Sequence, residues 1–340
     1  MTAAPAGRPR TARWLLRLHR PALIVWACLV VALAALLLAL RGPLTDAAAE
    51  GWRQYNACQG RGRCTYDQDA ILRYKDFAGY ANLALNALPV LVAAWAGAAL
   101  IGRELESGTA RLAWTQSTSP ARWLTLRLAL PAAAVTVGTG LLCRLHRLAW
   151  AAGDGGIDTA KHWYDLLTFN AGGPTVAALA LAGLAAGTLA ALLLRRTLPA
   201  LIAGAVATLG IAGAAALLMP RLWPAVTLTS ALDEDYPNVD GLVVDQGLVS
   251  ATGARLPIPD CDTGAGCSAA YDRAVGYFTT YHPVSHYWPL QLTTTALLLA
   301  VTGLLAAGSF LALRRLTGPL RTAGAAAGTP STDTLAGAAA

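Results

Sequence analysis

The residues that could do chemistry are few, and four cysteines stand out among them. Cys58 and Cys64 are separated by five residues, and Cys261 and Cys267 repeat this spacing. Such thiols can oxidise to disulfides in an oxidising compartment or bind zinc as thiolates. The spacing differs from that of the usual zinc knuckle, so we favour disulfides. Four cysteines allow three connectivities, of which Cys58–Cys64 and Cys261–Cys267 are the simplest.

Two histidines, His282 and His286, lie in a proline- and tyrosine-rich stretch, YHPVSHYWP. They could bind a metal as a pair, but surface residues near an aromatic belt are the favoured interpretation. The sequence contains no G-x-x-x-x-G-K-[ST] phosphate loop, no H-E-x-x-H and no G-x-S-x-G. We therefore expect no enzyme, no resident metal and no cofactor in this chain. Any ATP and magnesium would have to bind to another subunit.

The amino-acid composition indicates the kind of protein in which these residues are held. Of the 340 residues, 55% are hydrophobic and only 13% are charged, with a mean hydropathy of +0.47. A soluble protein carries about 25% charged residues, so a membrane protein is expected. The net charge of +7 does not indicate a nucleic-acid partner, because the arginines flank apolar runs and form no separate basic face.

Six apolar runs are long enough to cross a bilayer core of about 30 Å. The sequence therefore predicts an all-α integral membrane protein with a six-span domain over residues 21–313. Its large extracellular loop is expected at 220–289, and a disordered cytoplasmic tail at 314–340. The predicted spans are 21–40, 80–101, 124–143, 171–194, 198–219 and 290–313.

Six spans place both termini on one side of the membrane. Lys and Arg are denser in the terminal segments, the 2–3 connection and the 4–5 turn than in the other three connections. The positive-inside rule then puts the N and C termini in the cytoplasm. The two cysteine pairs agree, since they fall in connections assigned to the oxidising outer face. The basic residues of the 41–79 loop are the weakest part of this assignment.

Residues 1–20 are predicted to form a cytoplasmic tail followed by an interfacial helix over 11–20. Basic residues fall on one side of that helix and apolar residues on the other, which suits a helix lying at the membrane surface. The basic side carries Arg13, Arg17 and Arg20, and the apolar side carries Trp14, Leu15 and Leu18. A plain positive flank of the first span is the alternative.

The connection between spans 2 and 3, residues 102–123, reads GRELESGTARLAWTQSTSPARW. Gly108 is expected to end the helix of span 2, and Thr109 to cap a short helix over 110–116. Ser119 followed by Pro120 has the capping residue and first-position proline of the next helix. The chain is thus predicted to leave the bilayer, lie flat for about two turns, and re-enter.

Few polar residues lie inside the predicted spans. Asn82 and Asn86, one helical turn apart in span 2, could line a conduit or hydrogen-bond to a neighbouring helix. Gly183-x-x-x-Gly187 in span 4 offers close helix packing, within the chain or in a dimer. No acidic residue is expected at the midplane of a span, which argues against proton or sodium coupling.

The 102–123 segment resembles the signature of bacterial ABC-2-type transporter permeases, particularly the actinobacterial kind. In that family an R-E-x-E-x-G-T-x-R-L-x-W-T-Q-S run followed by R-W connects spans 2 and 3. The matching residues here are Arg103, Glu104, Glu106, Gly108, Thr109, Arg111, Leu112, Ala113, Trp114, Thr115, Gln116, Ser117, Arg122 and Trp123. Weaker similarities are LLLRRTLPAL after span 4 and YHPVSHYWPLQ before span 6. The long 220–289 loop has no place in the family pattern.

The resemblance implies a short cytoplasmic coupling helix that docks on a separate ATP-binding subunit. It further implies an exporter in the bacterial plasma membrane, with two copies of this chain surrounded by lipid. The residues expected to couple to the ATPase are Arg103, Glu104, Glu106, Gly108, Thr109, Arg111, Trp114 and Gln116. The alternative is a non-transporting membrane sensor or assembly factor that uses the 220–289 loop as an extracellular binding surface.

Overall fold

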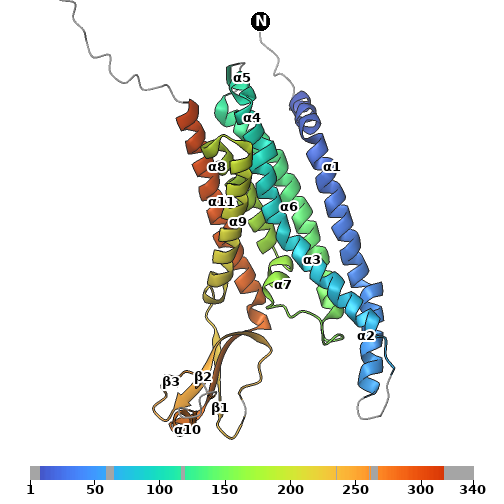
Figure 1. The fold of residues 1–340 in the computed structure, drawn as a ribbon, viewed down its shortest axis with the longest axis vertical. Coiled ribbons are helices and arrows are strands. Elements are labelled where there is room, and N and C mark those ends of the chain that lie inside the picture. The colour runs from blue at the N-terminus through green and yellow to red at the C-terminus, as the bar shows by residue number, and fades with distance from the viewer. Residues whose placement is uncertain are drawn as a thin grey trace, which may run out of the picture.

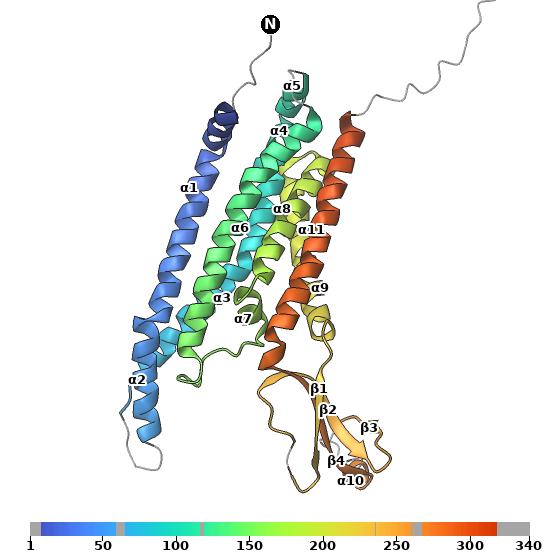
Figure 2. The same cartoon turned by 180° about the vertical axis from the view of Figure 1, so that it is seen from behind.

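Long helices packed side by side make up most of the computed structural model, and a small β-sheet lies at one end of them (Figures 1 and 2). The structure describes residues 8–58, 65–115, 119–234, 236–259, 261 and 267–317. The side chains of residues 8–16, 18 and 267 are outside this description. The helices before the sheet are α1 (Arg8–Arg41), α2 (Pro43–Ala57), α3 (Gln68–Trp95), the π-helical turn η1 (Ala96–Gly102), α4 (Arg103–Glu106), α5 (Thr109–Thr115), α6 (Pro120–Gly153), α7 (Leu166–Ala171), α8 (Thr175–Leu194), α9 (Thr197–Leu218) and the 3₁₀ turn η2 (Met219–Arg221).

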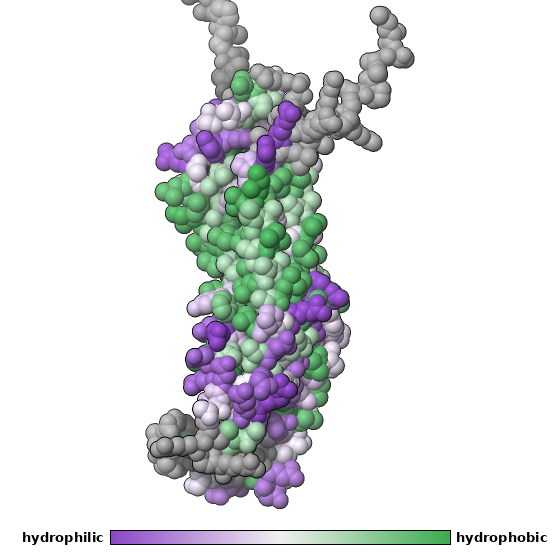
Figure 3. All heavy atoms as spheres, turned by 90° about the vertical axis from the view of Figure 1, so that its right-hand side faces the viewer, coloured by the Kyte–Doolittle hydropathy of each residue, from purple (hydrophilic) through white to green (hydrophobic). Residues whose placement is uncertain are grey.

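Six helical segments in the described part of the chain are long and apolar enough to cross a membrane. They are His19–Ala57, Gln68–Glu106, Pro120–Gly153, Thr175–Leu194, Thr197–Arg221 and Val284–Thr317. Figure 3 shows a hydrophobic band across the face in view, with hydrophilic residues toward both ends. The prediction of a six-span, all-α membrane protein is therefore confirmed for the membrane part.

Spans 1, 2, 3 and 6 were predicted shorter than the helices that contain them, whereas the predicted span 171–194 begins four residues before α8. Most of the expected polar loop over 41–79 is helical, because α2 follows α1 directly and α3 begins at Gln68. The Asp67 side chain caps α3 by accepting a hydrogen bond from the Ala70 amide at 2.9 Å. Likewise α6 continues to Gly153, and α11 (Tyr287–Thr317) includes residues 314–317 of the expected tail. Residues 318–340 lie outside the described part of the chain.

The separate interfacial helix predicted over 11–20 is not found. These residues belong to α1, which continues without a break into the first span although Pro21 lies inside it. Proline lacks the amide that an interior helical hydrogen bond needs, yet it is tolerated within membrane helices. The favoured prediction is therefore wrong, and the alternative, a positive flank of span 1, describes the observed helix.

The region predicted as a loop over 220–289 is a folded unit. It contains β1 (Val226–Ala231), β2 (Gly241–Ser250), β3 (Arg255–Leu256), α10 (Cys267–Tyr271), β4 (Ala274–Pro283) and the turn η3 (Val284–His286). The strands form one antiparallel sheet in the order β1-β4-β2-β3. The sheet lies beyond the helix ends, opposite the N-terminal end of α1 and the last turn of α11 (Figure 1).

We call the end that carries the start of α1 and α5 the inner end, and the end that carries the sheet the outer end. That the inner end faces the cytoplasm stays a prediction from the charge distribution.

Glycines let α8 pack closely at the centre of the bundle. A Cβ on Gly183 would lie 2.4 Å from the Pro89 carbonyl oxygen, and one on Gly187 only 2.1 Å from that of Ala93. Both carbonyls belong to α3, so the Gly183-x-x-x-Gly187 pattern serves packing within this chain. Small residues allow this approach because membrane helices associate mainly through close contact.

Candidate functional site

The connection between spans 2 and 3, residues 102–123, forms what we call the inner hairpin. It consists of the end of η1, α4, α5 and the first turn of α6, and it projects at the inner end (Figures 1 and 2). Gly108 has a φ of 74°, a left-handed conformation that glycine adopts without strain, and it lies between α4 and α5. Ser119 accepts a hydrogen bond from the Arg122 amide at 3.4 Å, with Pro120 in the first turn of α6. The predicted stop, short helix and restart are thus confirmed.

Two details of the hairpin differ from the prediction or lie beyond it. Thr109 does not cap α5: it is the first residue of that helix, and its hydroxyl donates to the Glu104 carbonyl oxygen at 3.3 Å. The same hydroxyl lies 3.0 Å from that of Ser107, so both threonine and serine stabilise the turn itself. Gln116 lies outside the described residues, and its expected contact with a partner stays a prediction.

Glu104 turns inward and forms an ion pair with Arg127 of α6. The indole of Trp123 hydrogen-bonds to the same carboxylate. Only 19% of the glutamate side chain and 13% of the arginine side chain are exposed, so water screens the pair poorly. We expected Glu104 to contact a partner. Instead the two side chains hold α4 against α6.

The Glu106 carboxylate also forms hydrogen bonds within the chain. Its carboxylate accepts a hydrogen bond from the Thr197 amide at 2.8 Å and a second from the Thr197 hydroxyl. Thr197 begins α9, and no side chain of the preceding Arg196 caps that helix. A carboxylate at a helix N-terminus satisfies free amides and opposes the positive end of the helix dipole. Glu106 therefore fastens the inner hairpin to α9.

The two faces of α5 differ. Ala110 is buried, and the ring of Trp114 packs edge-on against that of Trp123 with centroids 5.6 Å apart. The opposite face exposes Arg111, Leu112 and Thr115, with 59% of Leu112 accessible. Trp114, expected to contact a partner, is therefore mainly an anchor for α5. Leu112 was not among the predicted coupling residues, although it belongs to the sequence pattern.

After these contacts, the charge left on the surface of the hairpin is positive. Arg103, Arg111 and Arg122 are exposed, and their guanidinium groups form no ion pair within the part of the chain that the structure describes. Of the predicted coupling residues, Arg103 and Arg111 are thus the ones that present a free charge to solvent.

The family comparison matches the stretch that contains this hairpin. A model of the family described as ABC-2 membrane transporter related matches residues 27–223, which is more than half of the chain. The chain belongs to the ABC-2 membrane transporter related family. No curated protein and no solved structure matches it. This ABC-2 family member is a multi-pass membrane protein, which in bacteria places it in the plasma membrane. The match ends before the sheet begins.

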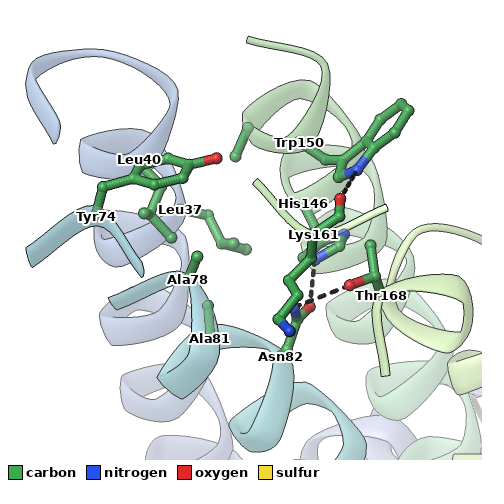
Figure 4. Close-up of a pocket in the computed structure, with 11 residues that line it drawn as sticks. Leu37, Leu40, Tyr74, Ala78, Ala81, Asn82, His146, Trp150, Lys161 and Thr168 are labelled. Carbon is green, nitrogen blue, oxygen red and sulfur yellow. Dashed lines mark hydrogen bonds between the residues drawn. The ribbon is translucent and has the colours of Figure 1, made fainter. Parts of the chain in front are cut away.

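A second group of polar residues in this ABC-2 family member surrounds Asn82, at the middle of α3 (Figure 4). The Asn82 amide nitrogen donates to the Thr168 hydroxyl at 3.1 Å, and its oxygen lies 2.7 Å from Nε2 of His146. Asn86 donates to the Leu167 carbonyl at 2.9 Å and accepts from Asn170 at 3.1 Å. The asparagines therefore join α3 to α6 and α7, which is the second of their two predicted roles.

The pocket beside Asn82 is small. It has a volume of about 30 Å³ and is lined on one side by apolar residues of α1 and α3, such as Leu37 and Ala78. Nδ1 of His146 is buried there without a hydrogen-bond partner among the described residues. Because Asn82 oxygen can only accept, His146 donates through Nε2, and its Nδ1 is an acceptor. The space suits about one water molecule, so it is too narrow for a conduit in this conformation.

The cysteines and histidines of the outer region are only partly described. Cys261 is disulfide-bonded. Cys64 and the side chain of Cys267 lie outside the described residues, so the pairings Cys58–Cys64 and Cys261–Cys267 stay predictions. His282, expected at the surface, is fully buried: its Nε2 donates to the Pro220 carbonyl oxygen at 2.9 Å.

The two outer histidines also contact each other, with Nδ1 of His282 3.1 Å from Nδ1 of His286. His282 therefore holds the end of β4 against η2. Within the described residues no group of three or more His, Cys, Asp or Glu side chains could hold a metal ion.

Proposed function

We propose that this chain is the permease subunit of an ATP-driven exporter, in which two copies pair with two separate ATP-binding subunits. Membership of the ABC-2 family and the six spans support a transporter component. The sequence has no phosphate loop, so ATP and magnesium belong to the partner subunit.

The observation that carries the proposal is the double attachment of the inner hairpin. Glu104 binds Arg127 on α6, and Glu106 binds Thr197 at the start of α9. The hairpin also continues directly from α3 through η1. A partner that displaces α5 would therefore move three spans together, because each is joined to the hairpin by covalent or charge-assisted contacts.

The turn η1 is the point at which α3 could bend when α5 is displaced. Single π-helical turns inside longer helices are rare and are found mainly at functional sites. Here Gly97 and Gly102 bring η1 close to the start of α9: a Cβ on Gly97 would lie 2.7 Å from the Ala200 carbonyl oxygen. In the proposed cycle, closure of the ATP-binding subunits pushes α5, and α3 tilts at η1 together with α6 and α9.

The surface that meets the partner is the exposed face of α5 with Arg103. Its chemistry calls for a partner groove that carries acidic residues for Arg103 and Arg111 and an apolar recess for Leu112. Charge complementarity of this kind speeds association and suppresses wrong partners.

Charge reversal tests this contact. Arg111→Glu should abolish co-purification of the ATP-binding subunit from cells that express both proteins. Arg221→Glu, which changes an exposed arginine of η2 at the outer end, is the matched control and should leave co-purification unchanged. Full recovery of the ATP-binding subunit with Arg111→Glu would contradict the proposed contact.

A non-transporting sensor or assembly factor is the second candidate, favoured by the folded sheet at the outer end. An ATP-binding subunit in an adjacent reading frame would support the exporter. An adjacent kinase or regulator would instead support the sensor.

A further inference from the structure

The inner part of α1 has two distinct faces. One packs on the bundle: His19 is 4% exposed, and the indole of Trp26 donates to the Ala134 carbonyl oxygen of α6 at 3.0 Å. The other face carries Arg17, Arg20 and Ile24, all exposed, at helical positions i, i+3 and i+7. Residues with this spacing lie in one row along a helix.

A groove of about 330 Å³ follows this second face. Arg17 and Arg20 line its inner part, and Leu23, Ile24 and Ala27 continue it toward the membrane. Neither guanidinium group forms an ion pair with a carboxylate in the portion of the chain that the structure describes. In both ribbon views α1 stands at the edge of the bundle (Figures 1 and 2), and the exposure of Arg17, Arg20 and Ile24 shows that the described chain leaves this row uncovered.

We propose that this groove binds the headgroup of an anionic phospholipid. Two unpaired guanidinium groups match a phosphodiester, since arginine binds phosphate oxygens through several N–H donors. The apolar residues that follow extend about 10 Å further along the helix, which suits the first part of an acyl chain. Ile24 is 52% exposed and the adjacent Val25 68%, as expected of side chains that face lipid.

Two arginines followed by apolar residues favour an anionic phospholipid over other ligands. A zwitterionic lipid would bring a positive group to two arginines. Free phosphate would leave the apolar half of the groove unused, and an anionic lipid satisfies both halves. The site involves no contact with an ATP-binding subunit, so it does not depend on the proposed transport function.

Native mass spectrometry of the full-length protein tests the site. The protein would be released from detergent in an equimolar mixture of phosphatidylglycerol and phosphatidylcholine. Wild type should retain phosphatidylglycerol preferentially, and R17Q/R20Q should lower that preference about tenfold, because each basic residue contributes separately to binding. R17K/R20K, which keeps both charges, should retain most of the preference.

The control is Arg144→Gln, which removes an exposed arginine further along α6, beyond its midpoint toward the outer end. It should bind phosphatidylglycerol as wild type does. Equal retention by wild type and R17Q/R20Q would show a non-specific lipid only and overturn the site. Displacement of the lipid by millimolar inorganic phosphate would identify free phosphate as the ligand, which also overturns it. If R17Q/R20Q does not fold, loss of the preference in R17K/R20K would count against the proposal.

Discussion

Arg127 shows how a single residue changes the interpretation of the inner hairpin. From the sequence it was an arginine near the end of a span, with no nearby acid to suggest a partner. In the structure it pairs with Glu104, on a different helix, and this pairing engages the glutamate within the chain. Thr197 is similar, since it lies 91 positions from the Glu106 that it binds. Contacts over such separations leave no local pattern in one sequence.

The Glu104–Arg127 pair should contribute measurably to stability. Glu104→Gln leaves the poorly hydrated guanidinium of Arg127 without its counter-charge, which should lower the free energy of unfolding by about 2–3 kcal/mol. Thermal unfolding in detergent would measure the loss. Arg103→Gln changes the adjacent but exposed arginine and should shift stability by less than about 0.5 kcal/mol. Equal effects of the two substitutions would show that the pair contributes little.

Loss of the Glu106–Thr197 contact should destabilise the protein less than loss of the Glu104–Arg127 pair, because it removes a helix cap and not an ion pair. Glu106→Ala removes the capping acceptor of α9, which should lower the midpoint temperature of thermal unfolding. Thr197→Val removes only the hydroxyl donor and keeps the hydrogen bond from the Thr197 amide. It should therefore destabilise the protein less than Glu106→Ala does. Thermal unfolding of the two variants in one detergent gives the comparison, and a larger loss for Thr197→Val would contradict a capping role.

At the scale of elements, the sequence predicts what depends on regular periodicity. Long apolar runs located all six spans, and Gly108, Ser119 and Pro120 located the breaks in the inner hairpin, because these residues have strong local preferences. The ends of α3 and α6 were missed because their outer turns are polar, so hydropathy does not reveal that they are helical. Tertiary packing extends such helices beyond the bilayer core.

The sheet was missed for a related reason. In strand β1, with the sequence VTLTSA, apolar and polar residues alternate over four positions, which is a short signal, and the strand is exposed along nearly its whole length. Its partner β4 lies about fifty residues later in the chain. Pairings between strands far apart in the chain define the unit, and one sequence does not show them.

Close packing of α8 against α3 gives a test at this scale. Gly187→Ala would place a Cβ 2.1 Å from the Ala93 carbonyl oxygen, so the helices must separate, at a cost of about 2 kcal/mol or more. Gly210→Ala on α9 meets no atom within 4 Å and should be neutral or slightly stabilising, since alanine is the better helix former. Comparing the midpoint temperatures of the two variants checks this. A stable Gly187→Ala protein would mean that α8 and α3 are less tightly packed.

For the whole molecule, the fold places three kinds of surface in different regions. The inner hairpin presents free arginines at one end, the β-sheet lies at the other, and apolar helix faces occupy the band between them (Figure 3). Such separation is what a subunit needs if it is to receive work on one side of a membrane and respond on the other. The central claim is that the two glutamates transmit this work from α5 to the spans.

The most direct measurement is ATP hydrolysis by the complex purified with its ATP-binding subunit, comparing wild type with E104Q/E106Q. The glutamates lie away from the exposed face of α5, so the variant should still bind the subunit. We predict that it loses the stimulation of ATP hydrolysis that the wild-type permease gives. Stimulation equal to that of wild type, or the failure of any ATP-binding subunit to co-purify with the wild-type chain, would contradict the claim.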